Sequence, residues 1–339
     1  MILLDSLYIN NSGGKILLDY LVEMLEDNNV SVYYLFDDRC KSDYYNIPVE
    51  RKIFLKATLV NRYKFYKKNK DKFDKVFCFG NLGPPISLNM PVYTYFHQSM
   101  YLNIPKELNY YQRFVLKIKS EIFEYLLNNT DFLIVQSNLM KERVNKKFKL
   151  SKDRILTIPF YQENNLKSGV TRIKDSFIYV SGGGAHKNHK RLIEAFCAFY
   201  DKTKKGKLII TIGDNFSELL DVIILLQQKG YPIINIGFVT REDLIQYYYA
   251  SEYLIFPSLE ESFGLGIAEA IDGGCKVIGA NLPYIYEVCR PSIIFNPTDI
   301  KDIERAFYNA IEKKEQKTEK KIYNQIDELL NILNNNARN

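Results

Sequence analysis

The sequence predicts an α/β protein built from two doubly wound domains in tandem, and three observations lead to that fold class. Short apolar segments alternate with helical segments along the chain, and this alternation starts afresh after residue 165. The chain has 339 residues, which is enough for two domains of ordinary size, each with its own core. Strands that alternate with helices favour a parallel sheet covered by helices on both faces.

In the first half of the chain, apolar runs rich in aromatic and β-branched residues predict five strands. They span residues 2–8, 31–36, 75–79, 92–96 and 132–136. Apolar residues at helical spacing predict four helices, at about residues 15–25, 59–72, 105–129 and 138–147. We expect these elements to form one domain over residues 1–165.

The second half repeats the pattern. Its predicted strands span residues 177–181, 207–213, 233–237, 253–257, 276–280 and 292–295. Its predicted helices lie at about residues 190–200, 216–229, 241–250 and 264–274. We expect a second domain over residues 166–316, with the polar segment 165–176 as the linker and the charged, then amphipathic tail 317–339 as a terminal helix.

Composition excludes several classes of protein. Apolar residues make up 46% and charged residues 25%, which is ordinary for a globular chain. The five cysteines are scattered and form no C-x-x-C pair, so neither a disulfide framework nor a zinc site is expected. Asp5 interrupts the opening apolar run before a signal peptide could form, and no apolar stretch approaches the ~18 residues that span a bilayer. These features predict a cytoplasmic protein.

Residues 51–75 form a basic block, with ten basic side chains against Asp71 and Asp74. Five aromatic side chains are interleaved with the bases: Phe54, Tyr63, Phe65, Tyr66 and Phe73. Such a segment suits an anionic membrane surface or a partner that bears phosphate groups. The alternative is a solvated helix face with no binding role.

The segment P-S-L-E-E-S-F-G-L-G-I-A-E-A-I-D-G-G, at 257–274, carries the strongest functional pattern. Glu261 lies in a loop after a strand, and Glu269 lies eight positions later, inside the helix that follows. The free N–H groups at the start of this helix favour a phosphate group. Carboxylates are strong acceptors for the hydroxyl groups of a sugar or ribose. The alternative is that Glu261 complements the helix dipole and Glu269 is merely exposed.

The pattern E-S-F-G-L-G-I-A-E, together with the glycine pair and V-I-G-A that follow, resembles the E-x7-E signature of family-4 glycosyltransferases. V-S-G-G-G-A-H-K-N-H-K-R at 180–191 resembles the first strand–loop–helix of that family's donor domain. The resemblance covers nearly all of 177–313 and is weaker over 1–165. It implies the GT-B architecture, in which two Rossmann-like domains face a cleft. It also implies transfer of a sugar from a nucleotide diphosphate sugar, with retention of anomeric configuration, to a glycan or lipid-linked acceptor in surface polysaccharide or lipopolysaccharide synthesis.

The resemblance also assigns roles to individual residues. Glu261 would contact hydroxyls of the donor sugar, Glu269 the ribose hydroxyls, and Lys187 the diphosphate. The donor site would also include Gly14, Phe263, Gly264 and Leu265, with a nucleobase loop at Gly237, Phe238 and Val239. The family usually has an arginine a few residues before the lysine; here Ser181 and three glycines fill that place. Either the charge of the leaving group is neutralised less strongly, or Lys190 or Arg191 supplies the missing charge.

His97 follows the predicted strand 92–96, and a histidine at this place faces the donor sugar in the family. A purely structural role for His97 is the alternative. The turn at residues 11–15 follows the first strand, and its glycines allow a phosphate or sugar to approach the backbone closely, unless the turn merely joins strand to helix.

The chain contains no Asp-x-Asp, the usual ligand pair for a metal-bound diphosphate, so neither metal nor cofactor is expected. We expect no nucleic-acid partner, and a peripheral place on the inner face of the membrane through the basic block. Two alternatives stay open: a sugar-nucleotide epimerase or hydrolase on the same fold, and a non-enzymatic basic binding module.

Overall fold

The computed structural model describes residues 1–44, 46–164, 169–312 and 316–335, and divides the chain into two compact units. Unit 1 comprises Met1–Ile104, Tyr110–Gln162 and Tyr323–Asn339, and unit 2 comprises Pro105–Asn109 and Glu163–Ile322. No described helix is both long enough and apolar enough to cross a membrane.

Unit 1 contains a parallel sheet of seven strands in the order β3-β2-β1-β4-β5-β6-β7. The strands are β1 (Ile2–Asp5), β2 (Val32–Asp37), β3 (Lys52–Leu55), β4 (Lys75–Cys78), β5 (Val92–Tyr95), β6 (Phe132–Val135) and β7 (Ile155–Thr157). In the register of the central strands, Leu3 lies opposite Tyr33 on one side and Val76 on the other. Strands that are buried on both faces consist of continuous runs of apolar residues, and such runs can be recognised in the sequence.

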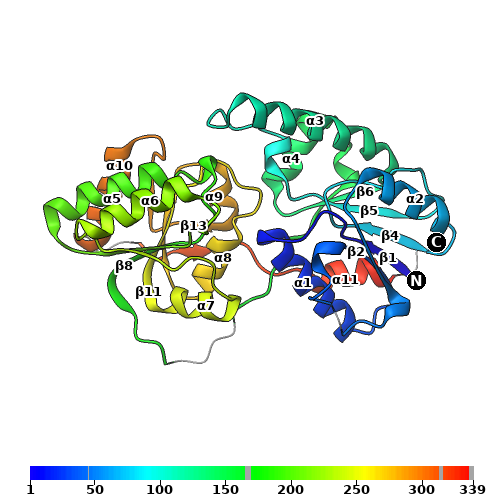
Figure 1. Ribbon diagram of the computed structural model, residues 1–339, viewed down its shortest axis with the longest axis horizontal. Helices are drawn as coiled ribbons and strands as arrows, with labels where there is room; N and C mark the ends of the chain where they lie inside the picture. The colour runs from blue at the N-terminus through cyan, green and yellow to red at the C-terminus, as the bar shows by residue number, and fades with distance from the viewer. Residues whose placement is uncertain (45, 165–168, 313–315, 336–339) are drawn as a thin grey trace. The chain divides into compact units, whose positions relative to one another are not determined.

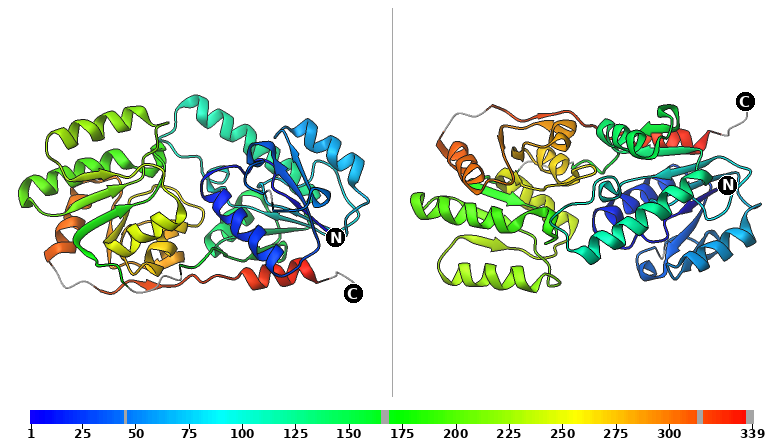
Figure 2. Two further views of the ribbon diagram at one scale, coloured as in Figure 1. Left: turned by 60° about the horizontal axis from the view of Figure 1, so that its bottom comes forward. Right: turned by 90° about the horizontal axis from the view of Figure 1, so that it is seen from above.

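Five helices cover this sheet (Figures 1 and 2). They are α1 (Ser12–Asp27), α2 (Leu59–Asn69), α3 (Tyr110–Leu126), α4 (Asn138–Phe148) and α11 (Ile326–Asn334). Helices α1 and α11 lie on one face of the sheet, and α2, α3 and α4 lie on the other. This division follows from right-handed crossovers, because the chain moves one way across the sheet after β1 and the opposite way after β3.

Unit 2 contains a second parallel sheet, in the order β10-β9-β8-β11-β12-β14. Its strands are β8 (Ile173–Tyr179), β9 (Lys207–Ile210), β10 (Ile233–Asn235), β11 (Ser251–Phe256), β12 (Lys276–Ala280) and β14 (Ile293–Phe295). Its helices are α5 (His189–Thr203), α6 (Ser217–Gln228), α7 (Arg241–Ala250), α8 (Leu265–Asp272), α9 (Pro283–Val288) and α10 (Ile300–Glu312). Helices α5, α6 and α10 cover one face, and α7, α8 and α9 cover the other (Figure 1).

Several boundaries differ from those expected. Helix α3 begins at Tyr110 rather than 105, because residues 105–109 are non-helical and belong to unit 2. Strand β8 begins at Ile173, inside the expected linker 165–176, of which residues 165–168 lie outside the described residues. The expected terminal helix over 317–339 is shorter: Glu319–Lys320 (β15) pairs with Cys289–Arg290 (β13), and only then does α11 follow.

Much of the basic block is structural. Arg62 is 2% exposed, and its Nε donates to Oδ2 of the equally buried Asp5 at 2.7 Å, which ties α2 to the end of β1. Lys75 donates to the carbonyl oxygens of Leu333 and Asn335 at the end of α11, each at 2.8 Å. Three of the five interleaved aromatic side chains belong to the core of unit 1: Phe65, Tyr66 and Phe73. The block therefore contributes fewer free charges and rings than the sequence suggests.

Both sheets have the same kind of strand order. The first strands of each unit are added on one side of its first strand, and the later strands are added on the opposite side. The reversal lies between β1 and β4 in unit 1 and between β8 and β11 in unit 2. Loops that leave the carboxyl ends of two such strands diverge and leave a crevice, and ligands of doubly wound sheets bind there. The two places to search for a site are therefore the loops after β1 and β4 and the loops after β8 and β11.

Candidate functional site

In unit 2 the two loops at the strand reversal are bonded to each other. The N–H of Leu259, in the loop after β11, donates to the carbonyl oxygen of His186, in the loop after β8, at 2.8 Å. The Asn188 side chain, buried in the same region, donates to the carbonyls of Pro257 at 3.1 Å and Pro297 at 2.7 Å. Asn188 itself has a left-handed backbone (φ 63°), a conformation that asparagine tolerates better than most residues. These bonds hold the two predicted motifs in one place.

Lys187 and Glu261 meet across these loops. Nζ of Lys187 lies 2.6 Å from Oε1 of Glu261, and the two side chains are 22% and 12% exposed. The Tyr179 hydroxyl donates to the carbonyl oxygen of Lys187 at 2.9 Å and so fixes its backbone. A cation and a carboxylate are thus held side by side, both still in contact with solvent.

Helix α8 (Leu265–Asp272) begins four residues after Glu261. Gly264 precedes its first residue, Leu265, with a left-handed backbone (φ 81°), and a Cβ there would lie 2.9 Å from Cδ1 of Ile267. Glycine is therefore required at this position. The buried Phe263 side chain anchors the turn. The first N–H groups of α8 have no partner inside the helix and follow the loop that carries Glu261, an arrangement that favours an anion.

Glu269 is buried within α8, at 5% exposure, which is not the exposed position that the alternative interpretation required. Burial raises its pKa to about 7, although Arg241 partly offsets the effect. Nη2 of Arg241 lies 3.4 Å from Oε1 of Glu269 and also donates to Oδ1 of Asn164 at 3.1 Å. Asn164 in turn donates to the Glu269 carbonyl oxygen at 3.0 Å. The buried carboxyl of Glu269 therefore holds its proton to a higher pH than an ordinary glutamate does.

Arg241 was not among the predicted site residues. It is the first residue of α7 and follows the segment Gly237, Phe238 and Val239 after β10. Gly237 has φ 63°, and Phe238 is 97% exposed. The signal available in the sequence was a single arginine at the start of a helix next to the predicted nucleobase loop, which is too common to identify a site.

The glycine run 182–184, in the place where the resembled family usually has an arginine, has no room for a side chain at its centre. A Cβ on Gly183 would lie 2.5 Å from Cγ of Phe216. Arg191, one of the two expected substitutes, directs Nη1 to Oδ1 of Asn188 at 2.9 Å, and Lys190 is exposed. Lys187 is the basic side chain that contacts Glu261.

In unit 1 the structure brings Gly14 and His97 together. A Cβ on Gly14 would lie 3.3 Å from Nε2 of His97, so the glycine leaves the ring edge uncovered. Asn81, which was not predicted, also contacts Nε2 of this ring. Its Oδ1 accepts from the His97 backbone N–H at 2.7 Å, and its Nδ2 lies 3.2 Å from Nε2 of the ring.

These two bonds determine the tautomer of His97. Because Oδ1 of Asn81 accepts, its Nδ2 is the donor, and Nε2 of His97 must accept. The ring proton then resides on Nδ1, which is buried and has no hydrogen-bond partner within the described residues. Burial lowers the pKa of His97 to about 4, so the ring is neutral at pH 7. His97 is thus a neutral side chain whose N–H at Nδ1 is buried without a partner among the described residues.

Among the described residues, no group of three or more His, Cys, Asp or Glu side chains is placed to hold a metal ion.

Comparison with known proteins gives the following matches. A family model described as "Glycosyl transferases group 1" matches residues 162–328. "Serotype-specific mannosyltransferase WbdA" of Escherichia coli is 35% identical over 130 residues, which are 37% of this chain and 16% of that protein. The chain thus spans only a small part of the length of this relative.

Two solved structures share the fold. The crystal structure of WaaG, a glycosyltransferase involved in lipopolysaccharide biosynthesis, has a TM-score of 0.67 at 14% identity, over 98% of this chain and 99% of that one. Anabaena Alr3699/HepE in complex with UDP and glucose has a TM-score of 0.64 at 14% identity, over 92% and 89%. This likeness confirms the expected α/β, GT-B fold over almost the whole chain.

Proposed function

We propose, on the premise that residues 162–328 form a group 1 glycosyl transferase domain, that this chain transfers a sugar from a nucleoside diphosphate sugar to a glycan acceptor. The observation that carries the proposal is the contact between Lys187 and Glu261, at 2.6 Å, at the point where the strand order of unit 2 reverses. This is where a doubly wound sheet binds a nucleotide.

The donor would occupy three neighbouring features of unit 2. The diphosphate would lie between Lys187 and the N-terminus of α8, since both favour negative charge. Glu261 would exchange its contact with Lys187 for hydroxyl groups of the sugar, and Glu269 would accept hydrogen bonds from the ribose hydroxyls. The exposed ring of Phe238 would stack on the nucleobase. The HepE structure, which was solved in complex with UDP and glucose, supports a nucleoside diphosphate sugar as the donor.

In the reaction, the bond between the anomeric carbon and the diphosphate oxygen breaks, and a bond to the acceptor oxygen forms. The acceptor's proton passes to the departing phosphate, and attack from the same face retains the configuration. Lys187 and the α8 N–H groups balance the charge that develops on the leaving diphosphate, so no metal is needed for this purpose. His97, which is neutral, would face the donor sugar, as the resemblance to family-4 glycosyltransferases implies.

The acceptor we propose is a lipid-linked glycan of a cell-surface polysaccharide, and the sugar to try first is mannose. The E. coli relative is described as a mannosyltransferase, and WaaG as acting in lipopolysaccharide biosynthesis. An enzyme of this kind would work in the cytoplasm at the membrane that holds its acceptor.

The test is release of nucleoside diphosphate from a panel of UDP- and GDP-sugars, with and without lipid-linked glycan acceptors. Acceptor-dependent release, with a product larger by one sugar, supports the transferase. Release that ignores the acceptor would indicate a hydrolase, and a changed sugar on an intact nucleotide would indicate an epimerase. Lys187→Ala should lower turnover by about 10²–10³, whereas Lys190→Ala, on the exposed neighbour, serves as the matched control.

A further inference from the structure

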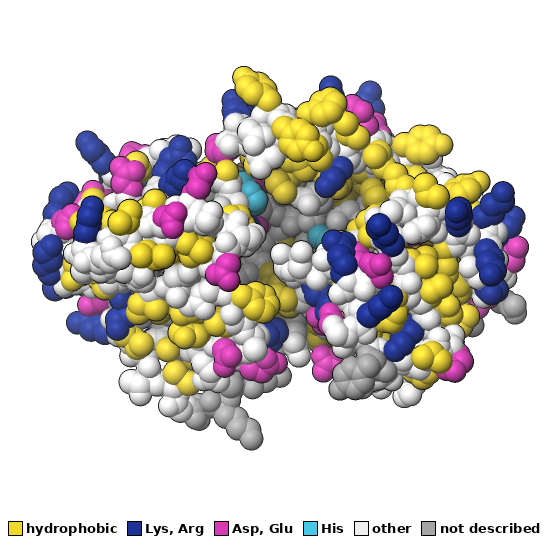
Figure 3. Space-filling model, viewed as in Figure 1, with side chains coloured by type: hydrophobic (Ala, Val, Ile, Leu, Met, Phe, Trp, Pro, Cys, Tyr) yellow, Lys and Arg dark blue, Asp and Glu magenta, His cyan; other side chains and the backbone are white. Residues whose placement is uncertain are grey.

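Helix α3 of unit 1 is apolar on the face that points away from its core. Its buried side chains are Ser120, Phe123 and Leu126, which define the inner face. The opposite face carries large apolar side chains with high exposure: Tyr110 at 89%, Tyr111 at 76%, Phe114 at 62%, Ile118 at 40% and Tyr125 at 72%. Figure 3 shows hydrophobic side chains gathered over α3. Surface helices normally place polar residues outward, so this face requires an explanation.

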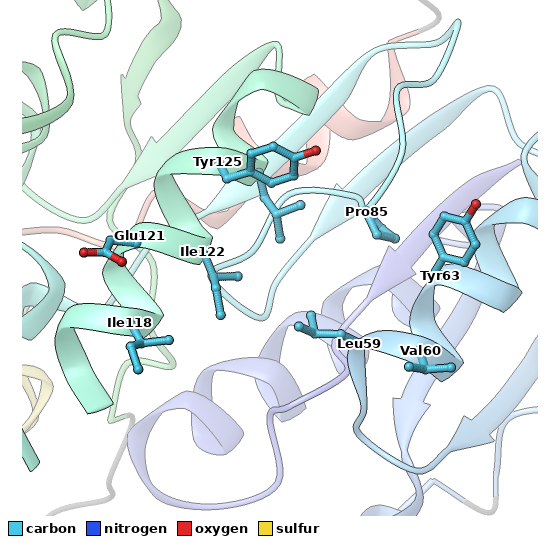
Figure 4. A pocket seen from close by; sticks show the side chains of 9 residues that line it. Leu59, Val60, Tyr63, Pro85, Ile118, Glu121, Ile122 and Tyr125 are labelled. Atoms are coloured by element: carbon cyan, nitrogen blue, oxygen red, sulfur yellow. The ribbon is translucent and has the colours of Figure 1, made fainter. Parts of the chain in front are cut away.

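The first turn of α2 extends this apolar surface. Leu59, Val60 and Tyr63 are 44%, 61% and 44% exposed. Together with Pro85 and with Ile118, Ile122 and Tyr125 of α3, they line an open groove of about 580 Å³. In Figure 4, Leu59 of α2 and the two isoleucines of α3 point toward one another across the groove, while the Glu121 carboxylate points away from it. We call the outer face of α3 and this groove the α2–α3 surface.

The charges that flank the α2–α3 surface are positive on balance. Helix α3 contains Arg113, Lys117 and Lys119, and its two acidic residues, Glu121 and Glu124, follow near its C-terminal end. Helix α2 contains Lys64, Lys67 and Lys68, all exposed, and no acidic residue. Aromatic and aliphatic side chains flanked by lysine and arginine are what an interfacial helix presents to an anionic bilayer, because the rings enter the headgroup layer while the bases meet the phosphates.

We propose that the α2–α3 surface docks on an anionic bilayer. The proposal shifts the membrane contact away from the basic block as a whole, since Arg62 and Lys75 of that block are engaged within unit 1. The bases that remain relevant are those of α2, and the larger apolar contribution comes from α3, a segment that the charge pattern of the sequence did not indicate. Docking attaches one face of unit 1 and requires no helix that spans the membrane.

The first test uses a property of the whole chain, which contains no tryptophan. In Phe114→Trp, the introduced indole is the only one, and its emission should shift to the blue when vesicles of phosphatidylglycerol and phosphatidylcholine are added at low salt. The matched control is Leu225→Trp, at a similarly exposed apolar position (56%) on α6 of unit 2. Its emission should not change. Binding of the vesicles without a shift at position 114 would overturn the proposal.

The second test separates the apolar and the charged contributions by vesicle sedimentation. Tyr110→Ser/Tyr111→Ser/Phe114→Ser should reduce the partition coefficient at least tenfold, whereas Val222→Ser/Ile224→Ser/Leu225→Ser, which removes three exposed apolar side chains from α6, should leave it unchanged. Each base near an anionic surface contributes about fivefold. Lys64→Glu/Lys67→Glu should therefore lower binding at least about 25-fold, while Lys205→Glu/Lys229→Glu, on exposed lysines of unit 2, is the control for net charge.

Three results would contradict the proposal. The parent protein could ignore anionic vesicles at low salt, or bind phosphatidylcholine vesicles equally well. Sedimentation velocity could instead show a dimer that the α3 serine variant converts to a monomer, in which case a second copy of the chain covers this face. None of these measurements depends on catalysis, so they are independent of the proposed transfer reaction.

Discussion

Replacement of Glu269 by glutamine should stabilise the protein at pH 8 and leave it nearly unchanged at pH 4.5. Burial raises the pKa of this carboxyl from 4.5 to about 7, so the folded protein holds the proton more tightly than the unfolded chain does. Above pH 7 the ionised carboxylate therefore costs about 3 kcal/mol of folding free energy, a cost that is absent below pH 4.5 and grows between these values. Glutamine has the shape of the neutral acid and avoids the cost.

The measurement is urea unfolding of parent and Glu269→Gln at both pH values, followed by circular dichroism. We expect the difference in the free energy of unfolding to increase by about 3 kcal/mol from the lower pH to the higher. Glu194→Gln, at an exposed carboxyl on α5, should show the same pH dependence as the parent. An equal loss of stability in Glu269→Gln at pH 4.5 and pH 8 would refute the reasoning, because it would mean that the ion pair with Arg241 outweighs desolvation.

The same carboxyl connects pH to ligand binding. Ribose hydroxyls donate hydrogen bonds, so a bound nucleotide should favour the carboxylate and lower its pKa. Binding at pH 7 should then release a fraction of a proton, up to about one half, and affinity should rise with pH up to about 8. Calorimetry in two buffers of different ionisation enthalpy measures the release, which Glu269→Gln should abolish. Nucleotide binding by the parent without proton release would exclude Glu269 from the ribose contact.

Three further substitutions test the remaining parts of the site. Lys187→Ala should lower kcat by about 10²–10³ while the affinity for a nucleoside monophosphate stays within threefold, since the charge acts on the leaving diphosphate; equal losses in both would contradict this assignment. Asn81→Asp should raise the pKa of His97 and move its ring proton to Nε2, which nitrogen NMR of the imidazole detects, and a pH-dependent fall in kcat should accompany the change. Phe238→Ala should weaken nucleotide binding by about 1–3 kcal/mol without altering the melting temperature, and an unchanged dissociation constant would remove the stacking contact.

The features that the sequence predicts well are those set by local periodicity. Most of the strands of both sheets lie where continuous apolar runs predict them, because buried parallel strands have little other composition available. The two strands of these sheets that the sequence did not predict are β3 and β7, which have four and three residues. Strand β3 begins with Lys52 at the edge of the sheet and lies within the basic block, so its three apolar residues are too short a run among charged neighbours to predict a strand.

The sequence placed the start of α3 at about residue 105, whereas the helix begins at Tyr110. Residues 105–109 carry no strong stop signal that separates them from the helix, and their assignment to unit 2 depends on contacts made after folding. The apolar outer face of α3 was equally hidden. Its tyrosines and phenylalanine follow the same helical spacing as core residues, and only the packing of Phe123 shows which face is the inner one.

In the candidate site, too, the sequence could nominate some residues, whereas others are recognised only once the chain is folded. Lys187 and Glu261 could be nominated because the motifs that contain them resemble those of family-4 glycosyltransferases, and both follow strands whose carboxyl ends share one edge of the sheet. Arg241 and Asn81 could not be nominated, although each fixes the state of a predicted residue. Their partners, Glu269 and His97, lie 28 and 16 positions further along the chain, and a polar residue becomes a partner only once loop geometry aims its side chain.

The consequence is that the sequence identifies the groups that would touch the ligand but not their charge. From the sequence, Glu269 is an ordinary carboxylate, yet burial raises its pKa to about 7. His97 reads as a histidine that could titrate near pH 6.5, yet burial keeps it neutral, and Asn81 decides which nitrogen carries the proton. A neutral imidazole at His97 and a protonated carboxyl at Glu269 each cost less to bury in the free protein than a full charge would. The Glu269 carboxyl can then ionise when ligand hydroxyl groups donate hydrogen bonds to it.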